Sequence, residues 1–378
     1  MPTALCNGRI MVPAGLRDDV CVVIDGTDIR TVSSGPPPDA EIVDLGGKLL
    51  LPGFVDVQVN GGGGRLFNDD PSVETIAAIA AAHRRFGTTG LLPTLISDDL
   101  NVVEKGIAAV DAAIAAGVPG ILGIHVEGPF LSPARHGIHL TSKLRRLEDD
   151  FIAVLGGAKH GRTLVTIAPE IVRPDQVARL TAAGVIVSAG HSDAGYDQVR
   201  AAIDSGVTGF THLFNAMSQL RNRAPGMVGA ALEDESVYCG VIVDGHHIHP
   251  ASLRVALRAK GPEHMMLVTD AMPSVGCENG DFLLQGRAIT RSDDRLLDAE
   301  GTLAGSTLSM ARAVANVIDM GRVTLHQASR MASTTPAEFL GLGDRLGAIV
   351  AGLRADLVAL NDDYTVAQSW IGGVPDRD

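Results

Sequence analysis

The 378-residue chain has few cysteines and few aromatic residues, and its basic residues are outnumbered by acidic ones. The four cysteines are Cys6, Cys21, Cys239 and Cys277, and no two of them form a CxxC pair. This spacing indicates neither a disulfide framework nor a thiolate zinc cluster. Lys and Arg total 31 against 44 Asp and Glu, and the formal charge of −13 argues against non-specific binding to nucleic acid or to an anionic membrane surface.

Long apolar runs are also missing. No uninterrupted run reaches the roughly 18 residues that a membrane-spanning helix needs. Residues 1–19 lack the basic stretch followed by an apolar run that marks a secretory signal peptide. We therefore expect a soluble, cytoplasmic protein. Hydrophobic residues make up 46% of the chain and charged residues 20%, which excludes a wholly disordered chain and provides ample material for a core.

The two ends of the chain differ in texture from the middle. Short strand-like runs broken by Gly, Pro and Ser occupy residues 1–52, and similar runs, among them 347–350 and 355–360, occupy residues 345–378. Neither end has enough strands to bury a sheet face alone. We therefore expect the two ends to form one small β-sandwich domain together, beside a larger domain made by residues 53–344.

The middle of the chain alternates between apolar runs of strand length and Ala-, Leu-, Arg- and Glu-rich stretches with helical spacing. The strand candidates are 53–59, 88–95, 121–126, 163–168, 185–189, 207–210, 239–243 and 265–269. Eight parallel strands close a (β/α)8 TIM barrel, which is the fold that we expect for residues 53–344. An open, doubly wound α/β sheet is the alternative if fewer of these runs are true strands.

Polar residues stand at the ends of most of these runs. In chain order they are Gln58 and Asn60, Glu127, His191, His212, Asp244 and Asp270. The C-terminal ends of parallel barrel strands meet at one mouth, and catalytic residues of such barrels lie there. We therefore expect these side chains to converge in space, although they are far apart along the chain.

Three of these residues, Glu127, His191 and His212, are candidate metal ligands. Two imidazoles and one carboxylate suit Zn²⁺ or another borderline divalent ion and leave a fourth position for water. Such an ion can lower the pKa of the bound water from 15.7 to about 7. The alternative is a set of hydrogen-bonded polar residues at the barrel mouth, which the placement of all three directly after buried strands disfavours.

Asp270 has the position expected of a general base, since a carboxylate beside such a water can take its proton and later deliver it to a leaving group. A helix or turn cap is the alternative for an aspartate. Gln58 and Asn60 stand where metal-dependent barrels often carry a His-x-His pair. Because amide side chains are weak, neutral ligands, we expect one functional metal and interpret this pair as a vestigial second metal position.

Arg223 and the backbone of residues 214–217 are candidates for holding an anionic group, because a guanidinium and free N–H groups at a turn make a phosphate site. A solvated surface residue is the alternative for Arg223 alone. His139 lies in a Gly-containing loop where a lid over a substrate would lie. A dense histidine group follows the seventh run: His246, His247 and His249. Ligand-facing and interface roles are as consistent with this group as a second metal cluster is.

Taken in chain order, eight motifs run along nearly the whole sequence. They are Pro52-Gly-Phe-Val-Asp-Val-Gln-Val-Asn-Gly61, His125-Val-Glu-Gly-Pro129, Gly190-His-Ser-Asp193, Thr211-His-Leu-Phe-Asn-Ala-Met217, Asp244-Gly-His-His247, Val268-Thr-Asp-Ala271, Gly301-Thr-Leu-Ala-Gly-Ser306 and Ala332-Ser-Thr-Thr-Pro336. With them the chain resembles the N-acetylglucosamine-6-phosphate deacetylases of the metal-dependent amidohydrolase superfamily. The resemblance implies a (β/α)8 barrel, a small β domain built from both chain ends, and a homodimer.

The resemblance also implies a role for each site residue. The metal ligands fall on Glu127, His191 and His212, the catalytic acid/base on Asp270, and the histidine that orients the substrate carbonyl on His139. The phosphate and sugar contacts fall on Asn215, Ala216, Arg223 and His247, the last of which reaches into the neighbouring subunit's site. Gln58 and Asn60 match the one-metal branch of the family. Residues 273–300 match little, so the resemblance assigns no substrate contact there.

The implied reaction is hydrolysis of the acetamide of N-acetylglucosamine 6-phosphate to glucosamine 6-phosphate and acetate, in amino-sugar catabolism or cell-wall sugar recycling. The implied cofactor is one divalent ion per subunit, with Zn²⁺ expected and Fe²⁺, Co²⁺ and Mn²⁺ as alternatives. Another amidohydrolase, acting on a cyclic amide, a purine or a different N-acetyl amino sugar, is the second reading. A catalytically silent scaffold is the third, which the joint presence of Glu127, His191, His212 and Asp270 disfavours.

Overall fold

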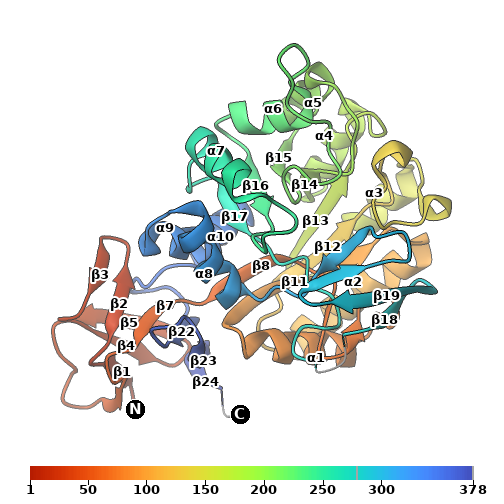
Figure 1. Ribbon diagram of the computed structural model, residues 1–378. Helices are drawn as coiled ribbons and strands as arrows, with labels where there is room; N and C mark the ends of the chain where they lie inside the picture. Colours follow the sequence, from red (N-terminus) through yellow and green to blue (C-terminus); the bar gives the residue numbers. More distant parts are fainter. Residues whose placement is uncertain (278–279, 377–378) are drawn as a thin grey trace.

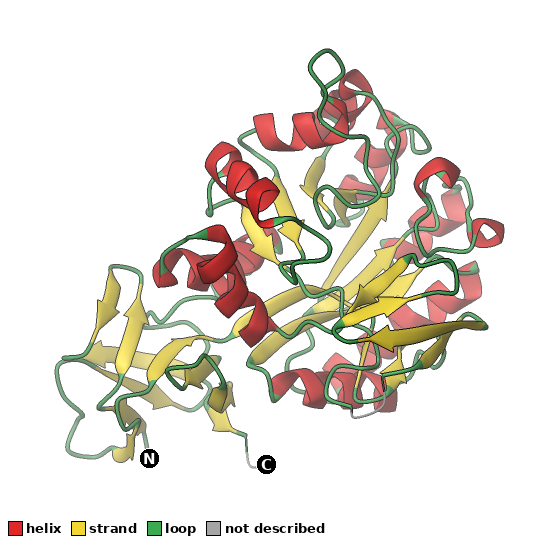
Figure 2. Cartoon of the chain, in the orientation of Figure 1, coloured by secondary structure: helices red, strands yellow, loops and turns green. Residues whose placement is uncertain are grey.

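The computed structural model describes residues 1–277 and 280–376 and shows a barrel of alternating strands and helices beside a smaller β-sandwich (Figures 1 and 2). The barrel strands are β8 (Phe54–Val59), β11 (Thr88–Ile96), β12 (Gly123–Glu127), β13 (Arg162–Ile167), β14 (Ile186–Ala189), β15 (Val207–Phe210), β16 (Tyr238–Val241) and β17 (Met265–Leu267). They pair in parallel in this order. All eight predicted runs, and the predicted TIM barrel, are therefore confirmed.

Helices cover the outside of the barrel (Figure 2). They are α1 (Val73–Arg84), α2 (Leu100–Ala115), α3 (Asp149–Leu155), α4 (Pro174–Ala182), α5 (Tyr196–Asp204), α6 (Gly226–Glu233), α7 (Pro250–Lys260) and α8 (Met310–Gly321), and α9 (Leu325–Ser329) and α10 (Thr335–Phe339) follow. Helix α1 shows why they form. The Ser72 side chain accepts a hydrogen bond from the backbone of Thr75, and Ile76, Ile79 and His83 recur at helical spacing on its buried face. None of the described helices is long and apolar enough to cross a membrane.

The barrel closes between its first and last strands by a seam with few ladder hydrogen bonds. Strands β8 and β17 are the two edges of the eight-stranded sheet, and the parallel bridge between Val59 and Ala271 joins this seam at the mouth. At the other end a π-helix, Arg330–Thr334, packs across it, and the Ser333 hydroxyl donates to the Pro52 carbonyl over 3.1 Å. Backbone groups along the seam therefore need side-chain partners.

Two sheets form the β-sandwich. One contains β5 (Asp28–Ser33), β4 (Cys21–Asp25), β1 (Thr3–Cys6) and β6 (Glu41–Asp44), and the other contains β24 (Val374–Pro375), β23 (Val366–Ile371), β22 (Leu357–Leu360), β7 (Leu49–Pro52), β2 (Arg9–Val12) and β3 (Gly15–Arg17). Antiparallel pairing of β22 with β7 brings the two chain ends into one sheet. Residues 347–350, expected to be strand-like, form no strand: the Gly347 carbonyl accepts a hydrogen bond from the Thr334 hydroxyl, and Ile349 packs in the core of the sandwich.

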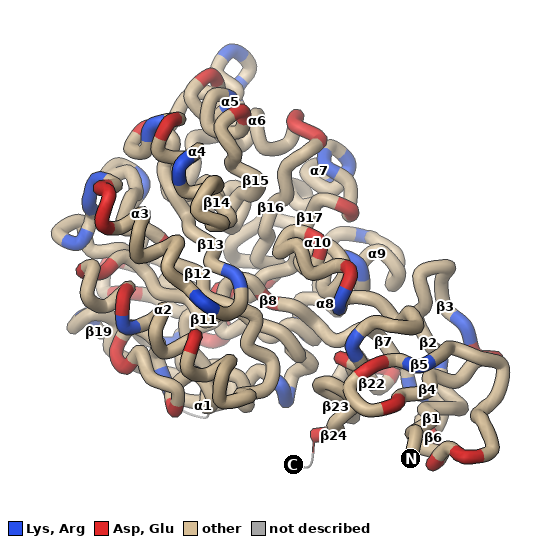
Figure 3. The backbone as a smooth tube through the Cα atoms, turned by 180° about the vertical axis from the view of Figure 1, so that it is seen from behind, with Lys and Arg blue, Asp and Glu red and all other residues tan. Residues whose placement is uncertain are grey.

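Strands β7 and β22 also join the sandwich to the barrel. Leu50 and Leu357 pack in the core between the two sheets, whereas Leu51 and Val358 belong to the barrel core. Because successive side chains alternate across a strand, these two strands bury both faces. The small β domain built from both ends is thus confirmed, while its division from the barrel at residues 52 and 345 stays a prediction. Figure 3 shows acidic and basic residues interspersed over both the barrel and the β-sandwich.

A disulfide joins Cys6 to Cys21, which the sequence spacing did not indicate. The two residues are 15 positions apart, and the antiparallel pairing of β1 with β4 brings them together. A spacing rule cannot find such a pair, because strand register alone makes the two cysteines neighbours. Cys239 and Cys277 are free.

The chain between β17 and α8 folds into a four-stranded antiparallel sheet, which we call the insert (residues 282–306). Its strands are β18 (Phe282–Leu284), β19 (Arg287–Ser292), β20 (Arg295–Leu297) and β21 (Leu303–Ser306). The apolar residues of the insert pack against Ile96, Ile138 and Met272. The insert therefore rests on loops at the mouth of the barrel.

Candidate active site

A cavity of about 340 Å³ lies at the barrel mouth. Four of its lining residues, Glu127, His191, His212 and Asp270, come from the ends of four different strands, as the barrel geometry predicts. The candidates His139, Asn215, Ala216 and His247 also line it. Glu127, His139, His191 and His212 are all at most 5% exposed. The cavity thus gathers buried titratable groups from distant parts of the chain, which is typical of an active site.

Glu127, His191 and His212 point their donor atoms at one another. Glu127 Oε1 lies 3.0 Å from His212 Nε2 and 3.3 Å from His191 Nε2, and the two Nε2 atoms are 3.0 Å apart. Around a tetrahedral zinc ion with bonds of about 2.0–2.1 Å, neighbouring ligand atoms are separated by about 3.4 Å. The triangle of donor atoms is therefore close to the size that one such ion requires.

The Nδ1 atoms of the two histidines, which face away from the cavity, have different surroundings. His191 donates from Nδ1 to the Arg135 carbonyl over 2.9 Å, which leaves its Nε2 lone pair for the cavity. His212 Nδ1 is buried and has no hydrogen-bond partner among the described residues. Burial opposes charge on Glu127, but its close contacts with His191 and His212 outweigh this effect and hold the pKa of the carboxyl well below its usual value. Glu127 is therefore ionised, as a metal ligand must be.

The local backbone explains how these side chains turn inward. His191, His212 and Asp270 have φ values of +48°, +35° and +51°, in the left-handed region. This conformation costs a non-glycine residue roughly 1–2 kcal/mol, so the surrounding structure must impose it. Each of the three residues lies two or three positions after the end of a barrel strand, where the sharp turn redirects the side chain toward the cavity.

Asp270 is surrounded by groups that control its charge. Burial raises the pKa of its carboxyl to about 7, and the negative charge of Glu127 adds to this effect. The amide of Asn60 donates to Asp270 Oδ1 over 2.6 Å, and Gln58 donates to Glu127 Oε1 over 3.2 Å. The two amides that replace the His-x-His pair are thus donors to the acidic groups of the cavity.

His139 is oriented by Ser97. The backbone N–H of Ser97 donates to His139 Nδ1 over 3.2 Å, and the Ser97 hydroxyl lies 2.8 Å from the same nitrogen. Burial, followed by the electrostatic effect of the neighbouring His191 ring, holds the pKa of His139 well below its usual value. The ring is therefore neutral, and its remaining proton is on Nε2, where it is available as a hydrogen-bond donor.

His139 is also an alternative third ligand, because a donor atom of its ring lies within 4.8 Å of those of Glu127 and His191. The separations of 3.0 to 3.3 Å within the set that contains His212 fit a single ion better. We therefore treat His212 as the third ligand and His139 as a donor to substrate.

The candidate phosphate contacts do not all lie together. Asn215 and Ala216 line the cavity, and Phe214 and Ala216 adopt left-handed φ values of +78° and +48°. When left-handed and right-handed φ values alternate along a short segment, successive N–H groups point toward a common position. Such an arrangement can bind an anion. Arg223 is exposed and lines a separate surface pocket together with Arg135.

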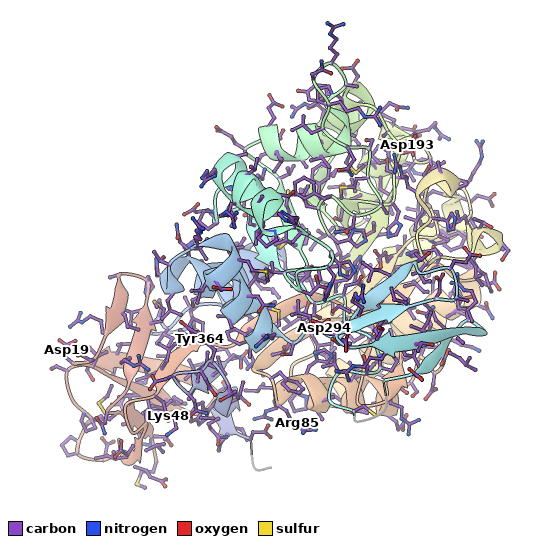
Figure 4. The ribbon with its side chains drawn as sticks, viewed as in Figure 1. Asp19, Lys48, Arg85, Asp193, Asp294 and Tyr364 are labelled. Atoms are coloured by element: carbon purple, nitrogen blue, oxygen red, sulfur yellow. A yellow bond between two sulfur atoms is a disulfide. The ribbon has the colours of Figure 1, made fainter. Side chains whose placement is uncertain are left out.

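His247 is a further lining residue of the cavity, and its expected contribution to the neighbouring subunit's site stays a prediction. It lies in the loop that follows barrel strand β16. Its Nδ1 contacts the Asp244 carboxylate at 2.6 Å. His246 instead contacts Asp294 of the insert at 2.7 Å, and Figure 4 labels Asp294 near the centre of the molecule. His249 accepts a hydrogen bond from Ala251 at the start of α7, so the three histidines form no second metal cluster.

Sequence reasoning missed one wall of the cavity. Ile96, Ile138 and Met272 line it, together with Thr302 and Leu303 from the turn and strand at the end of the insert. The insert has a recognisable signal in the sequence, since Gln285-Gly286 separates two short strand-like runs and both residues have positive φ, as a two-residue hairpin turn requires. The apolar wall itself has no such signal, because ordinary core residues form it.

Comparison with known proteins places these observations in a family. The amidohydrolase family model matches residues 49–375. An N-acetylgalactosamine-6-phosphate deacetylase from Shewanella sp. (strain ANA-3) is 46% identical over 343 residues, which are 91% of this chain and 87% of that protein. The crystal structure of N-acetylglucosamine-6-phosphate deacetylase from Pasteurella multocida has a TM-score of 0.97 at 31% identity and covers 100% of both chains. A mutant deacetylase from Mycobacterium smegmatis, in complex with N-acetyl-D-glucosamine-6-phosphate, has a TM-score of 0.92 at 34% identity over 99% of both chains.

Proposed function

The chain belongs to the amidohydrolase family, and we propose that it is the deacetylase of an N-acetylated amino-sugar 6-phosphate. The substrate that we assign is N-acetylglucosamine 6-phosphate, and the products are glucosamine 6-phosphate and acetate. The observation that carries the proposal is the convergence of Glu127, His191 and His212 with Asp270 in one cavity. Metal-assisted amide hydrolysis needs ligands for a divalent ion and, beside them, a carboxylate that can accept and donate a proton.

The donor set fits a divalent ion. Glu127 is ionised, His191 presents a lone pair, and the buried His212 ring has an unpartnered nitrogen on its far side. We propose that these three residues hold one ion, expected to be Zn²⁺, with Fe²⁺, Co²⁺ or Mn²⁺ as alternatives. When bound, the ion would polarise the acetamide carbonyl and make the attacking water more acidic.

The chain's own residues would move the protons. Asp270 would take a proton from the attacking water and return it to the amide nitrogen as the C–N bond breaks, so that the amine leaves neutral. His139 would donate from Nε2 to the carbonyl oxygen, where negative charge develops. Asn60 would hold the Asp270 carboxylate through its hydrogen bond of 2.6 Å.

The first test is acetate release from N-acetylglucosamine 6-phosphate by the purified, metal-replete protein. We expect turnover, and we expect kcat/KM to fall by about 100-fold or more for the sugar without phosphate, because the remote anion positions the acetamide. Absence of acetate from every N-acetylhexosamine 6-phosphate would refute the proposed function.

N-acetylgalactosamine 6-phosphate is the second candidate substrate. It differs from the first only in the configuration at C4, and the relative with 46% identity is named for it. The ratio of kcat/KM for the two epimers decides between them. We expect the gluco epimer to be preferred, and a clear preference for the galacto epimer would replace the substrate assignment while leaving the reaction unchanged.

The cavity needs a cation for the phosphate. The described residues that line it include no lysine or arginine, and Arg223 lies outside it on the same chain. We therefore propose a homodimer in which Arg223 of one protomer completes the phosphate site of the other. Because a charged sugar phosphate does not cross a lipid bilayer unaided, we place the enzyme in the cytoplasm.

Mixing two impaired variants, assayed with substrate well below the KM of the parent, tests this arrangement. Arg223→Ala is expected to raise KM by about 10- to 100-fold, the value of one charge-assisted hydrogen bond. When subunits of Arg223→Ala and Asp270→Asn exchange, one site of each mixed dimer regains both intact groups, and about a quarter of the parent activity should return. Arg221→Ala, on the same exposed loop, is the matched control and should leave KM unchanged. If mixing restores nothing, Arg223 serves its own chain.

A further inference from the structure

The barrel layer directly beneath the candidate site is polar. Barrel interiors are mostly filled by branched apolar side chains, because buried polar groups cost free energy unless they are hydrogen-bonded. On one side His125, Thr166, Thr211 and Ser188 form a hydrogen-bonded chain with separations of 2.7 to 2.8 Å. On the other side, at the seam between β8 and β17, Asp56 and Thr269 form a second polar group.

Asp56 replaces backbone pairing at the seam. Its side chain is fully buried and lies on β8. Oδ1 accepts hydrogen bonds from the backbone of Gln58 at 3.2 Å and of Thr269 at 3.3 Å, and Oδ2 accepts one from the Thr269 hydroxyl at 2.5 Å. A single carboxylate thus links the first strand to the segment that follows the last strand, where β8 and β17 have no regular ladder.

Every backbone polar group of residues 269–271 has a partner. Ser306 donates twice, from its hydroxyl to the Thr269 carbonyl (2.5 Å) and from its N–H to the Asp270 carbonyl (2.9 Å). On the β8 side, Asp270 N–H donates to the Gln58 carbonyl (2.9 Å), and the Ala271 carbonyl accepts from Asn60 N–H (2.9 Å). Ala271 N–H donates to the Thr269 hydroxyl (3.2 Å). With Thr269 N–H on Asp56, all six groups are satisfied. The Ala271 carbonyl accepts a second hydrogen bond from Gly61 N–H at 3.0 Å, so seven hydrogen bonds restrain this tripeptide.

The middle residue of this tripeptide is Asp270, in a left-handed conformation with φ of +51°. That conformation aims its carboxylate at the cavity, and an aspartate does not adopt it without restraint. The hydroxyls of Thr269 and Ser306 supply that restraint from opposite sides, one from the barrel and one from the end of the insert. We propose that Asp56, Thr269 and Ser306 are positioning residues that hold Asp270 where it can take up and return a proton. This inference rests on the proposed function of Asp270.

The alternative is that these contacts only close the barrel. A structural role would lower the melting temperature of a variant and leave the kinetics of the folded fraction unchanged. A positioning role changes kcat and leaves KM unchanged, because ground-state binding does not depend on the angle of Asp270.

The test compares three variants in the full-length, metal-replete protein. Thr269→Val keeps the shape and removes the hydroxyl, and we expect kcat to fall by roughly 10- to 100-fold, as small misplacements of reacting groups do, while KM and metal content stay within about twofold of the parent. Thr269→Ser retains the hydroxyl and should restore kcat to within about threefold of the parent. Ser306→Ala, which removes the hydroxyl on the opposite side, should also lower kcat.

Asp270→Asn, measured alongside, separates the two possible failures. If Asp270→Asn is inactive and Thr269→Val has the kcat of the parent, the positioning role is wrong and the proposed function stands. If Asp270→Asn retains the parent activity, the proposed role of Asp270 is wrong and the positioning role falls with it, whereas absence of acetate release from the parent would refute the proposed function. If Thr269→Val does not fold, Ser306→Ala decides, and an unchanged kcat in that variant overturns the inference. A raised KM with unchanged kcat overturns it as well.

Discussion

Asp270→Asn should retain one divalent ion and substrate affinity while its kcat falls by about 10³- to 10⁴-fold, the upper range for loss of a general acid/base. The amide has nearly the shape of the carboxylate and keeps an oxygen that can accept from Asn60, so the cavity is preserved. It cannot accept a proton from water at neutral pH. Metal analysis, substrate binding and acetate release in one preparation check the three parts of this prediction.

The pH dependence of the parent protein's activity is an independent test of the proposed role of Asp270 as a base. Burial and the charge of Glu127 raise its pKa to about 7, and the proposed base is the ionised form. Activity should therefore rise with pH through this pKa and be lost below it. A bound cation stabilises the carboxylate, so the acid limb should lie at or below about pH 7. Asp270→Asn should lack this limb.

A matched control separates a catalytic effect from a general effect of removing charge. Asp175 is an exposed aspartate at the start of α4, where it pairs with Arg173. Asp175→Asn makes the same chemical change outside the cavity and should leave kcat within about twofold of the parent. A loss of less than about tenfold in Asp270→Asn would mean that another group moves the proton.

Removal of the divalent ion should abolish acetate release, and added Zn²⁺ should restore it. The proposed ligand set predicts one ion per chain by elemental analysis. A second ion is not expected, because the amides of Gln58 and Asn60 are weak ligands that already donate to Glu127 and Asp270. Full activity after exhaustive chelation, or two ions per chain, would contradict this prediction.

A variant of a proposed ligand histidine, compared with a variant of a histidine outside the ligand set, makes the metal experiment more specific. His212→Asn removes one proposed ligand and should lower both the metal content and kcat by at least about tenfold, since a neutral amide coordinates weakly. His249→Asn is the control, because His249 lies at the start of α7 and accepts a hydrogen bond from Ala251 there. It should retain one ion per chain. Equal metal loss in both variants would indicate an effect on folding instead of ligation.

The sequence predicted those parts of the molecule that depend on strand periodicity. Eight apolar runs and the polar residues that follow them were enough to place Glu127, His191 and His212 at one mouth, because parallel strands in a barrel all end on the same side. The left-handed φ of His191 and His212, which turns their side chains inward, was not predictable from residue type. It results from tertiary contacts that no local pattern records.

Other parts were missed for the same reason. The Cys6–Cys21 disulfide depends on the register between β1 and β4, and the apolar wall formed by Ile138 and Met272 consists of residues that are indistinguishable from any other core residue. Periodicity identifies elements, whereas register and loop direction emerge only when the elements pack.

The pairing of β7 with β22 has a consequence for biosynthesis. Leu51 pairs with Val358, so the ribosome must translate the whole barrel between them before the six-stranded sheet can be completed. The barrel can assemble before β22 is made, but β7 has one unpaired edge during this time. An unpaired strand edge is prone to aggregation. A nascent chain stalled before residue 357 should therefore need chaperone protection of β7, and synthesis of β22 becomes the step that completes the fold.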